Sequence, residues 1–410
     1  MRVLLLNDAS TPTGGAELQS LRLRELLRER GHEVRLLSSD AHEGGGPPGA
    51  DVLCRGSTHP RGRVLRETVN PSAVLALRRE LASFRPDVVH ARMFLTQLSP
   101  AVLPLLRDVP TLWHVVYYKA ICPRGTKLLP DGRRCPHPAG RVCLAERCVT
   151  PQSWALAMVQ RRLRARWAGS VDRVVTLSQT MRRRLEAEGV TVDDVVPNGV
   201  RERPARPPLS GRPTVAFAGR LVPEKGAHVL VRAMAEVLRA VPTAQLVLVG
   251  AGPQEQRLGA LAAELLPADA VRATGHLARA DAERVLDQAW VQAVPGLWEE
   301  PLGNVVLEAG VRGTAVVATT AGGPGEMVEP GRTGLLVEPG SVGGLASALT
   351  DLLGDRERCE RLGASARGRA LAEWTEGTMV DRLLAGYTQM LADGTRRGPG
   401  GARSPGGAGR

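Results

Sequence analysis

The sequence predicts an α/β protein made of two doubly wound domains, each a parallel sheet with helices on both faces. Short apolar segments alternate with helical segments from residue 2 onwards, and the same alternation starts again after residue 213. The length of 410 residues suits two or three domains rather than one small module. Alternation with short connections favours parallel strands, because a covering helix carries the chain back to the start of the next strand.

The first domain is predicted over residues 1–200. We expect its first strand at Arg2–Asn7, a helix from Gly14 to about Arg30, and a second strand at Glu33–Ser38. Four further buried strands are predicted at residues 86–90, 110–114, 172–177 and 195–199. Ligands of such sheets bind beyond the carboxyl ends of the strands, so the residues that follow each strand are the candidates for a site.

A linker separates the two domains. Residues 201–213 are rich in arginine and proline and have no apolar period, which is typical of a connecting segment. The second domain is predicted over residues 214–372. Its strands are expected at residues 214–218, 245–249, 290–294 and 315–318.

The C-terminal part of the chain has two segments of different kinds. Residues 373–393 predict a helix that packs back on the first domain. Residues 394–410 contain glycine, proline and arginine without periodicity, so we expect a disordered tail there.

Composition and charge narrow the class of protein. With 43% hydrophobic and 23% charged residues, the chain is not disordered as a whole. The apolar run Val3–Leu6 is too short for a signal-peptide core and no apolar stretch is long enough to span a membrane, so we expect a cytoplasmic protein. The net charge of +12 suits a phosphate-bearing substrate, an anionic surface or nucleic acid. Only 3% of residues are aromatic, which disfavours a single-strand nucleic-acid reader, and we expect no nucleic-acid partner.

Glycines and basic residues follow the first strand of each domain. Gly14 and Gly15 open the first helix, where a phosphate or sugar could approach the backbone, although taken alone the two residues favour an ordinary glycine turn. In the second domain Gly219 is followed by Arg220 and Lys225, one of only three lysines in the chain. A guanidinium fork and a compact ammonium could clamp a diphosphate; the alternative is a pair of solvated loop residues.

The segment from Trp298 to Glu308 carries two carboxylates. Pro301 predicts the start of a buried helix, with Glu300 at its N-terminus and Glu308 two turns inside. A buried carboxylate needs partners such as ligand hydroxyls, so the two acids could grip two sugars of one ligand. The free backbone amides predicted to face phosphates between them belong to Leu302, Gly303 and Asn304.

In these residues the chain resembles the family 4 retaining glycosyltransferases, also called group 1, over nearly all of residues 1–391. The resemblance rests on five pieces in order with suitable separations. They are Gly14–Glu17, Pro197–Val200, Gly219-Arg220 with Lys225, Glu300–Glu308 as an E-x7-E motif, and the glycine turn Gly322–Glu326. It implies the GT-B fold, in which two Rossmann-like domains face each other across a cleft.

The resemblance also implies residue roles and a reaction. Arg220 and Lys225 would bind the diphosphate of a nucleotide-sugar donor, with Gly15 facing it from the other domain. Glu308 would bind the ribose hydroxyls, Glu300 the transferred sugar, and His114 would lie beside the reacting sugar. The family's usual His-Asp reads His114-Val115 here, which puts the detailed role of His114 in doubt.

The chemistry expected is transfer with retention and without a catalytic metal. Arg220, Lys225 and helix amides supply positive charge for the leaving diphosphate, and the chain has no Asp-x-Asp motif. No carboxylate nucleophile is evident, so front-face displacement is the default that the family implies. The acceptor is a hydroxyl group of unknown origin.

Four cysteines and a basic helix remain outside this scheme. Cys122, Cys135, Cys143 and Cys148 lie within an insertion at residues 122–148, and in a reducing compartment they predict a structural zinc site before disulfides; unrelated thiols are the alternative. Residues 154–167 form a basic amphipathic pattern that suits either an anionic membrane or a solvated helix face.

Two other functions stay open. A nucleotide-sugar epimerase could use the same donor pocket on the same architecture. A non-catalytic nucleotide or nucleic-acid binder is favoured only by the net charge. Nucleotide sugars separate these classes, because a transferase releases nucleotide, an epimerase gives a new sugar nucleotide, and a binder does neither.

Overall fold

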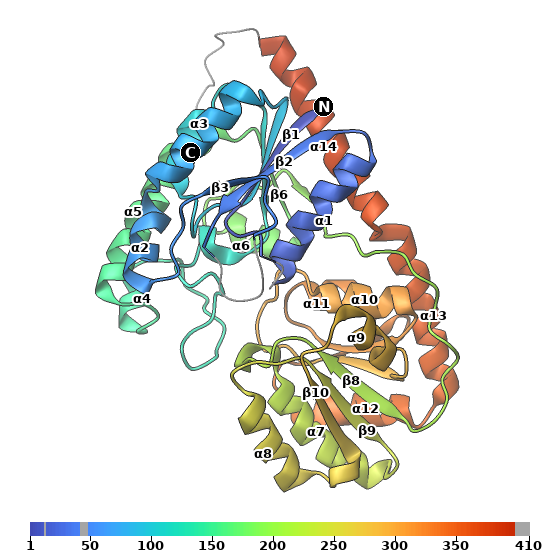
Figure 1. The fold of residues 1–410 in the computed structure, drawn as a ribbon. Helices are drawn as coiled ribbons and strands as arrows, with labels where there is room; N and C mark the ends of the chain where they lie inside the picture. Colours follow the sequence, from blue (N-terminus) through green and yellow to red (C-terminus); the bar gives the residue numbers. More distant parts are fainter. Residues whose placement is uncertain (12–13, 42–47, 398–410) are drawn as a thin grey trace.

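The computed structural model describes residues 1–11, 14–41 and 48–397, which fold into two α/β lobes (Figure 1). The first lobe contains a seven-stranded sheet in the order β3-β2-β1-β4-β5-β6-β7, and the second a six-stranded sheet in the order β10-β9-β8-β11-β12-β13. Neighbouring strands pair in parallel throughout both sheets. The predicted doubly wound α/β architecture is therefore confirmed.

The first sheet is built from β1 (Arg2–Asn7), β2 (Glu33–Ser39), β3 (Val52–Cys54), β4 (Val88–Met93), β5 (Thr111–Val115), β6 (Arg173–Thr176) and β7 (Asp194–Val195). Its helices are α1 (Gly15–Glu29), α2 (Pro60–Thr68), α3 (Pro71–Ser83), α4 (Val142–Ala145), α5 (Pro151–Arg166) and α6 (Gln179–Glu186). Short 3-10 helices lie at Pro100–Leu106, Tyr118–Ala120 and Ala168–Ser170.

The second sheet is built from β8 (Thr214–Ala218), β9 (Gln245–Val249), β10 (Val271–Gly275), β11 (Val291–Val294), β12 (Ala315–Thr319) and β13 (Gly334–Val337). Its helices are α7 (Ala227–Ala240), α8 (Glu255–Leu265), α9 (Arg279–Leu286), α10 (Asn304–Arg312), α11 (Gly322–Met327), α12 (Val342–Leu353) and α13 (Arg356–Glu373). Two 3-10 turns lie at Pro223–Lys225 and Ala268–Ala270, and α14 (Glu376–Arg397) ends the described chain.

The continuous apolar run of β1 explains why this sheet is covered on both faces. Leu4 and Leu6 pack into one hydrophobic cluster, whereas Val3 and Leu5 pack into another on the opposite face. Side chains alternate across a strand, so a strand that is apolar at every position must be buried on both sides. Burial of this kind places the strand ends, and not the sheet faces, at the surface where ligands can reach.

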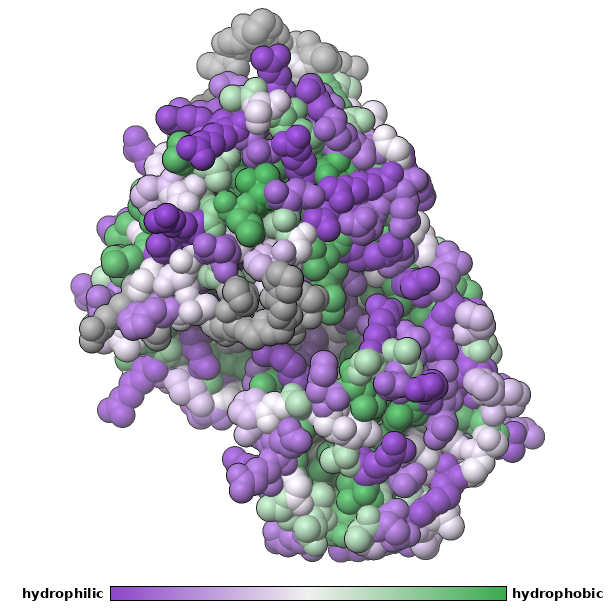
Figure 2. All heavy atoms as spheres, in the orientation of Figure 1, coloured by the Kyte–Doolittle hydropathy of each residue, from purple (hydrophilic) through white to green (hydrophobic). Residues whose placement is uncertain are grey.

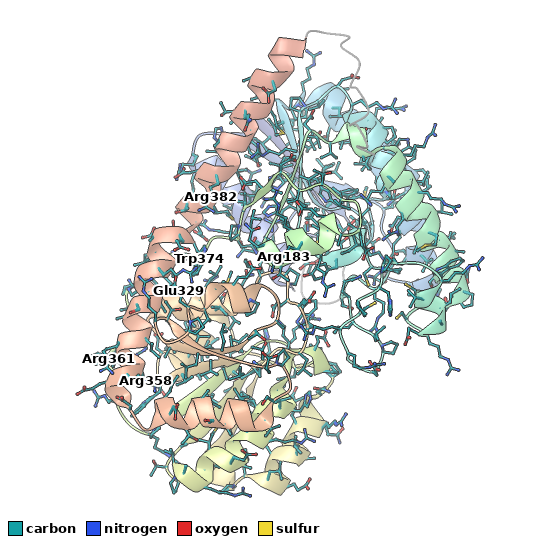
Figure 3. All side chains as sticks on the ribbon, turned by 180° about the vertical axis from the view of Figure 1, so that it is seen from behind. Arg183, Glu329, Arg358, Arg361, Trp374 and Arg382 are labelled. Carbon is teal, nitrogen blue, oxygen red and sulfur yellow. The ribbon has the colours of Figure 1, made fainter. Side chains whose placement is uncertain are left out.

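The chain crosses between the lobes twice at one place. The backbone of Val200 forms hydrogen bonds with that of Trp374 and Glu376, so the two crossing segments are bonded to each other. Beyond the bend, α14 runs back along the first lobe, where Tyr387 hydrogen-bonds His90 at 2.5 Å (Figures 1 and 3). Trp374 marks this bend in Figure 3.

Several sequence predictions differ from the structure. The strands β3, β10 and β13 were not predicted, and β4 continues to Met93. The strand β7 covers only Asp194–Val195, so Val195 alone of the predicted strand at residues 195–199 is regular. The segment at residues 201–213 is not a free linker, because Leu209 is buried and its N–H donates to Glu360 on α13 at 2.6 Å. Helix α14 extends to Arg397, so the tail does not begin at residue 394; the rest of the predicted tail lies outside the described residues.

Candidate functional site

The carboxyl edges of the two sheets meet at a direct contact between the lobes. Asn198 follows β7, and its Nδ2 donates to Oδ1 of Asn304, the first residue of α10, at 3.1 Å. A Cβ atom placed on Gly15 would lie 3.6 Å from Nδ2 of Asn304. The start of α1 in one lobe and the start of α10 in the other are therefore neighbours, as the glycine loop and the helix amides were predicted to be.

Lys225 and Glu300 form an ion pair in the second lobe. The ammonium of Lys225, in the 3-10 turn after β8, lies 2.5 Å from Oε1 of Glu300. Their side chains keep 20% and 15% exposure, and the second carboxylate oxygen of Glu300 has no partner among the described residues. A half-satisfied carboxylate beside a cation can accept a hydroxyl hydrogen bond from a ligand.

Arg220 lies at the surface directly after Gly219, which follows β8 with a φ of 151°. Its positive charge acts across the interface on Glu17, in the first turn of α1. Burial raises the pKa of the Glu17 carboxyl, Asp8 adds to the rise, and Arg220 with Arg92 opposes it. Arg220 is therefore close enough to the first turn of α1 for its charge to act there.

Helix α10 begins later than Pro301 predicted. It starts at Asn304. The preceding Gly303 has a left-handed φ of 89°, so Pro301 and Leu302 are not part of the helix. Glu300 therefore lies in the preceding loop and not on the helix that carries Glu308. The first N–H groups of α10 still have no carbonyl one turn earlier, so they face the interlobe contact made by Asn304.

Glu308 is exposed, which corrects the prediction that it is buried within an apolar helix. It nevertheless lies among enough protein for desolvation to raise its carboxyl pKa, while Arg312 and Arg279 act in the opposite direction. A carboxylate that solvent can reach but that protein surrounds is available to a ligand. Its predicted role at the ribose stays a prediction.

His114 is completely buried on β5. Its Nε2 lies 3.1 Å from the carbonyl oxygen of Val196, and its ring centroid lies 5.6 Å from that of His90. Burial lowers the pKa of both histidines well below the ordinary value, and the charge of Arg92 lowers them further. Protein covers the ring in this structure, and the predicted place of His114 beside a reacting sugar stays a prediction.

The predicted glycine turn Gly322–Glu326 forms most of the short helix α11, which packs on the Glu300 loop of its own lobe and contacts α6 of the first lobe. A side chain on Gly322, which has a φ of 70°, would collide with the backbone of Glu300, so the turn packs tightly on that loop. Glu326 accepts hydrogen bonds from the first N–H groups of α6, with 2.8 Å to Gln179. Arg183 of α6 also reaches Glu326 at 3.5 Å (Figure 3).

A second ion pair between the lobes, after that of Arg183 with Glu326, was not predicted from the sequence. Arg184 of α6 binds the carboxylate of Glu299 through two hydrogen bonds of 2.6 and 2.7 Å. Glu299 precedes Glu300, so this fork fixes the backbone next to a predicted donor residue. Nothing in the spacing of either residue signals the pairing, because it depends on how the lobes face each other.

The four insertion cysteines are free thiols. Burial raises the pKa of Cys143 and Cys148, and the neighbouring thiols of the insertion raise them further, so the four lie near one another. Within residues 1–11, 14–41 and 48–397, no three His, Cys, Asp or Glu side chains are arranged to hold a metal ion. The zinc site stays a prediction.

The basic helix α5 uses part of its charge inside the protein. The guanidinium of Arg164 lies 5.7 Å from the ring centre of Trp113, and Arg161 pairs with Glu188 at 3.3 Å. Arg162 and Arg166 are exposed. Hydrophilic residues cover much of both lobes in Figure 2, and no helix in the described part of the chain is long and apolar enough to cross a membrane.

Two parallel sheets that meet at their carboxyl edges, with glycine turns and paired charges gathered there, define the GT-B class of two-domain α/β proteins. Sequence comparison agrees. The family described as glycosyltransferase family 4 matches residues 13–203, and the family described as glycosyl transferases group 1 matches residues 201–369. The chain belongs to the family 4, group 1 glycosyltransferases.

Curated relatives include actinobacterial enzymes. A GDP-mannose-dependent α-(1-6)-phosphatidylinositol monomannoside mannosyltransferase of Mycolicibacterium smegmatis is 33% identical over 57% of this chain and 67% of that enzyme. Its Mycobacterium tuberculosis H37Rv counterpart is 39% identical, but the matched part spans 43% of this chain and only 47%, about half, of that enzyme. A D-inositol 3-phosphate glycosyltransferase of Nocardia farcinica is 38% identical over 57% of this chain and 56% of its own length.

Solved structures share the fold. Sucrose-phosphate synthase from Thermosynechococcus elongatus superposes with a TM-score of 0.72 at 22% identity, covering 96% of this chain and all of that one. Anabaena HepE in complex with UDP-glucose gives a TM-score of 0.67 at 20% identity, covering 95% of this chain and all of that one. These likenesses establish the GT-B fold of the chain.

Proposed function

We propose that this glycosyltransferase moves a sugar from a nucleoside-diphosphate sugar to an acceptor hydroxyl, with retention of configuration and without a catalytic metal. One observation carries the proposal. The Lys225–Glu300 pair and the start of α10 lie where the two sheets meet, opposite the glycine-rich start of α1. Cation, carboxylate and free helix amides are the groups that a sugar diphosphate needs.

Most of the predicted donor-binding residues have a role in this scheme. Lys225 and Arg220 bind the diphosphate, Glu300 binds the hydroxyls of the transferred sugar, and Glu308 binds those of the ribose. Gly15 leaves room for the phosphates at the start of α1, while the amides at Leu302–Asn304 provide further donors. The Lys225–Glu300 pair supports this assignment, because a donor can insert between two charges that already lie together.

Catalysis then rests on charge stabilisation. As the glycosidic bond breaks, negative charge grows on the leaving diphosphate, and fixed cations and helix N–H groups stabilise it without reorganising. The acceptor hydroxyl attacks from the face that the diphosphate leaves, and its proton passes to a phosphate oxygen. Because the new bond forms on the face that the diphosphate leaves, the configuration is retained without a side-chain nucleophile.

The relatives suggest the first substrates to test. Two of them are named for GDP-mannose and phosphatidylinositol mannosides, and a structural neighbour was solved with UDP-glucose. We therefore propose a cytoplasmic enzyme whose acceptor is a saccharide, a lipid or another hydroxyl compound. Arg162 and Arg166 on the exposed side of α5 are the residues with which it would contact an anionic membrane.

We propose in addition that the insertion binds one structural zinc ion through Cys122, Cys135, Cys143 and Cys148. The support is chemical: four free thiols lie near one another in one short insertion. Their raised pKa values mean that Cys143 and Cys148 must lose protons to become ligands, and the thiols must turn toward a common point.

The decisive experiment incubates the protein with GDP-mannose or UDP-glucose, with and without an acceptor panel and EDTA, and identifies products by NMR. The expected result is free nucleotide and a product whose anomeric configuration matches the donor, unchanged by EDTA. A new sugar nucleotide would identify an epimerase. Binding without any product would favour a non-catalytic binder, and inversion or loss of activity with EDTA would refute the mechanism.

A further inference from the structure

Arg92 is a buried guanidinium without an anionic partner. It lies near the end of β4, is only 1% exposed, and its Nη2 donates to Oδ1 of Asn198 at 3.1 Å. Its Nε and Nη1 atoms are buried and have no hydrogen-bond partner, and no carboxylate of the described residues forms an ion pair with it. Such a group is costly unless something else satisfies it, because a buried charge loses its hydration.

The position of Arg92 relates it to the interlobe contact. Val89 and Ala91 of β4 pack on one face of the sheet, and His90 bonds Tyr387 on the other. Arg92 follows where the pairing of β4 with β1 shifts register, and it bonds Asn198. Asn198, the hydrogen-bond partner of Arg92, is also the residue that binds Asn304 at the start of α10. Arg92 therefore lies one side chain away from the junction of the two lobes.

A carboxylate of the protein, that of Glu17, is close enough to both arginines to interact with their charges. The side chain of Glu17 folds back against Gly14 at the start of α1, where a helix favours negative charge. Arg92 in the first lobe and Arg220 in the second both act on its charge. Neither forms an ion pair with it in the described residues, so Glu17 accounts for neither guanidinium.

We propose that Arg92 and Arg220, from opposite lobes, bind one phosphate of the donor diphosphate at the start of α1, and that this phosphate displaces the Glu17 carboxylate. The inference rests on the proposed function and adds a donor-binding residue from the first lobe. A phosphate offers acceptor oxygens for the two unsatisfied atoms of Arg92, and it carries more charge than the carboxylate it replaces. Arg92 thus couples donor binding to the contact between the lobes through Asn198 and Asn304.

The test compares Arg92→Met with Arg92→Lys and with Arg382→Met, a control on the exposed side of α14 (Figure 3). Calorimetry with GDP and UDP should show that Arg92→Met weakens binding of the preferred nucleotide by about 10- to 100-fold, the loss expected for charge-assisted hydrogen bonds. Arg92→Lys should restore part of the affinity. Guanosine and uridine, which lack phosphate, should bind the variants and the parent protein alike.

Two more measurements separate ligand binding from a structural role. The melting temperature of Arg92→Met should equal or exceed that of the parent, since a buried unpaired charge is removed. Glu17→Gln should tighten nucleotide binding severalfold, because the resident anion is gone. A structural arginine would instead lower the melting temperature and leave nucleotide affinity intact in the folded fraction.

The outcomes keep this inference apart from the proposed function. If the parent protein binds neither nucleotide, both the proposed function and the role of Arg92 are refuted. If the parent binds and Arg92→Met binds equally well, only the role of Arg92 is overturned. Weaker binding by Arg92→Met with an unchanged Glu17→Gln would overturn the displacement of Glu17.

Discussion

The carboxyl edges of the two sheets have matching strand orders around their first strands but treat charge in opposite ways. In the second lobe Arg220 is exposed, and Lys225 is paired with Glu300 within reach of solvent. In the first lobe Arg92 and His114 are covered, and Arg92 pairs with no acidic residue in the described part of the chain. The charges of the second-lobe edge are therefore accessible to a ligand. The buried charge of Arg92 at the first-lobe edge would gain a partner only from a ligand or from a conformational change.

This difference has a consequence for mutants. Changes at the exposed residues of the second-lobe edge, Arg220 and Glu308, should alter chemistry with little effect on folding, because solvent already reaches these side chains. Changes at the first-lobe edge should alter both stability and binding, since those groups are dehydrated in the folded protein. The substitutions below test whether the two edges differ in this way.

The largest effect is expected at Lys225. Replacing it with alanine should lower kcat by about 100- to 1000-fold, as for loss of one fixed group that stabilises charge in the transition state. The melting temperature should also fall, because the variant leaves the mostly buried Glu300 carboxylate without its cation, so kcat is compared on folded protein. Lys119→Ala is the matched control, since Lys119 also pairs with a carboxylate, that of Glu67 at 2.9 Å, but within the first lobe. Equal losses of kcat in both variants would contradict the assignment.

A smaller loss is expected at Glu308. Glu308→Ala should weaken donor binding by about 10- to 100-fold, because charge-assisted hydrogen bonds contribute roughly 1.5–3 kcal/mol each. Calorimetry with the donor measures the effect directly. Glu283→Ala removes a carboxylate on α9 that lies near Glu308 and should leave the affinity unchanged. If both variants weakened the donor alike, the loss would be a general charge effect.

The pH dependence of donor binding should report the same carboxyl group. Burial raises the pKa of Glu308, so it takes up a proton at a higher pH than an ordinary glutamate. The protonated form is a poorer acceptor, and the donor should therefore bind more weakly as pH falls through that raised pKa. Glu308→Gln cannot titrate and should remove this step from the pH profile. An identical step in the glutamine variant would assign it to another group.

Sequence reasoning predicted most of the second-lobe edge and little of the first. The residues of this edge can be recognised locally in the sequence, as glycine turns, a rare lysine and two spaced glutamates. The strands that precede them can be recognised as apolar runs. The start of α10 was misplaced because Pro301 suits a first helical turn, while the left-handed Gly303 that overrides it is determined by tertiary packing. Glu308 was predicted to be buried because its sequence neighbours are apolar. Successive residues of a helix point in different directions, however, so Glu308 is exposed while its neighbours are buried.

Arg92 could not be found from the sequence for a different reason. In the segment Val88–Met93 it reads as a polar residue after a strand, and the strand was expected to end at His90. Its lack of a partner depends on α1, α14 and the second lobe, which are distant along the chain. The pairing of Arg184 with Glu299 escaped notice for the same reason.

The smallest effect on donor chemistry is expected in the cysteine insertion, which belongs to neither edge. Its base is held without metal, because Lys127 binds Glu188 at 2.7 Å and Leu128 and Leu129 are buried. Zinc would therefore order the outer part of the loop and leave the donor site unchanged.

Protein purified without a metal-affinity tag should contain about one zinc per chain, as one four-ligand site requires. Cys135→Ser should lose that zinc while donor affinity stays within about twofold, a change of roughly 0.4 kcal/mol. Acceptor KM should rise, if the loop shapes the acceptor pocket. Absence of zinc from the parent protein, with all four thiols freely titratable in the folded state, would leave the cysteines as unrelated thiols.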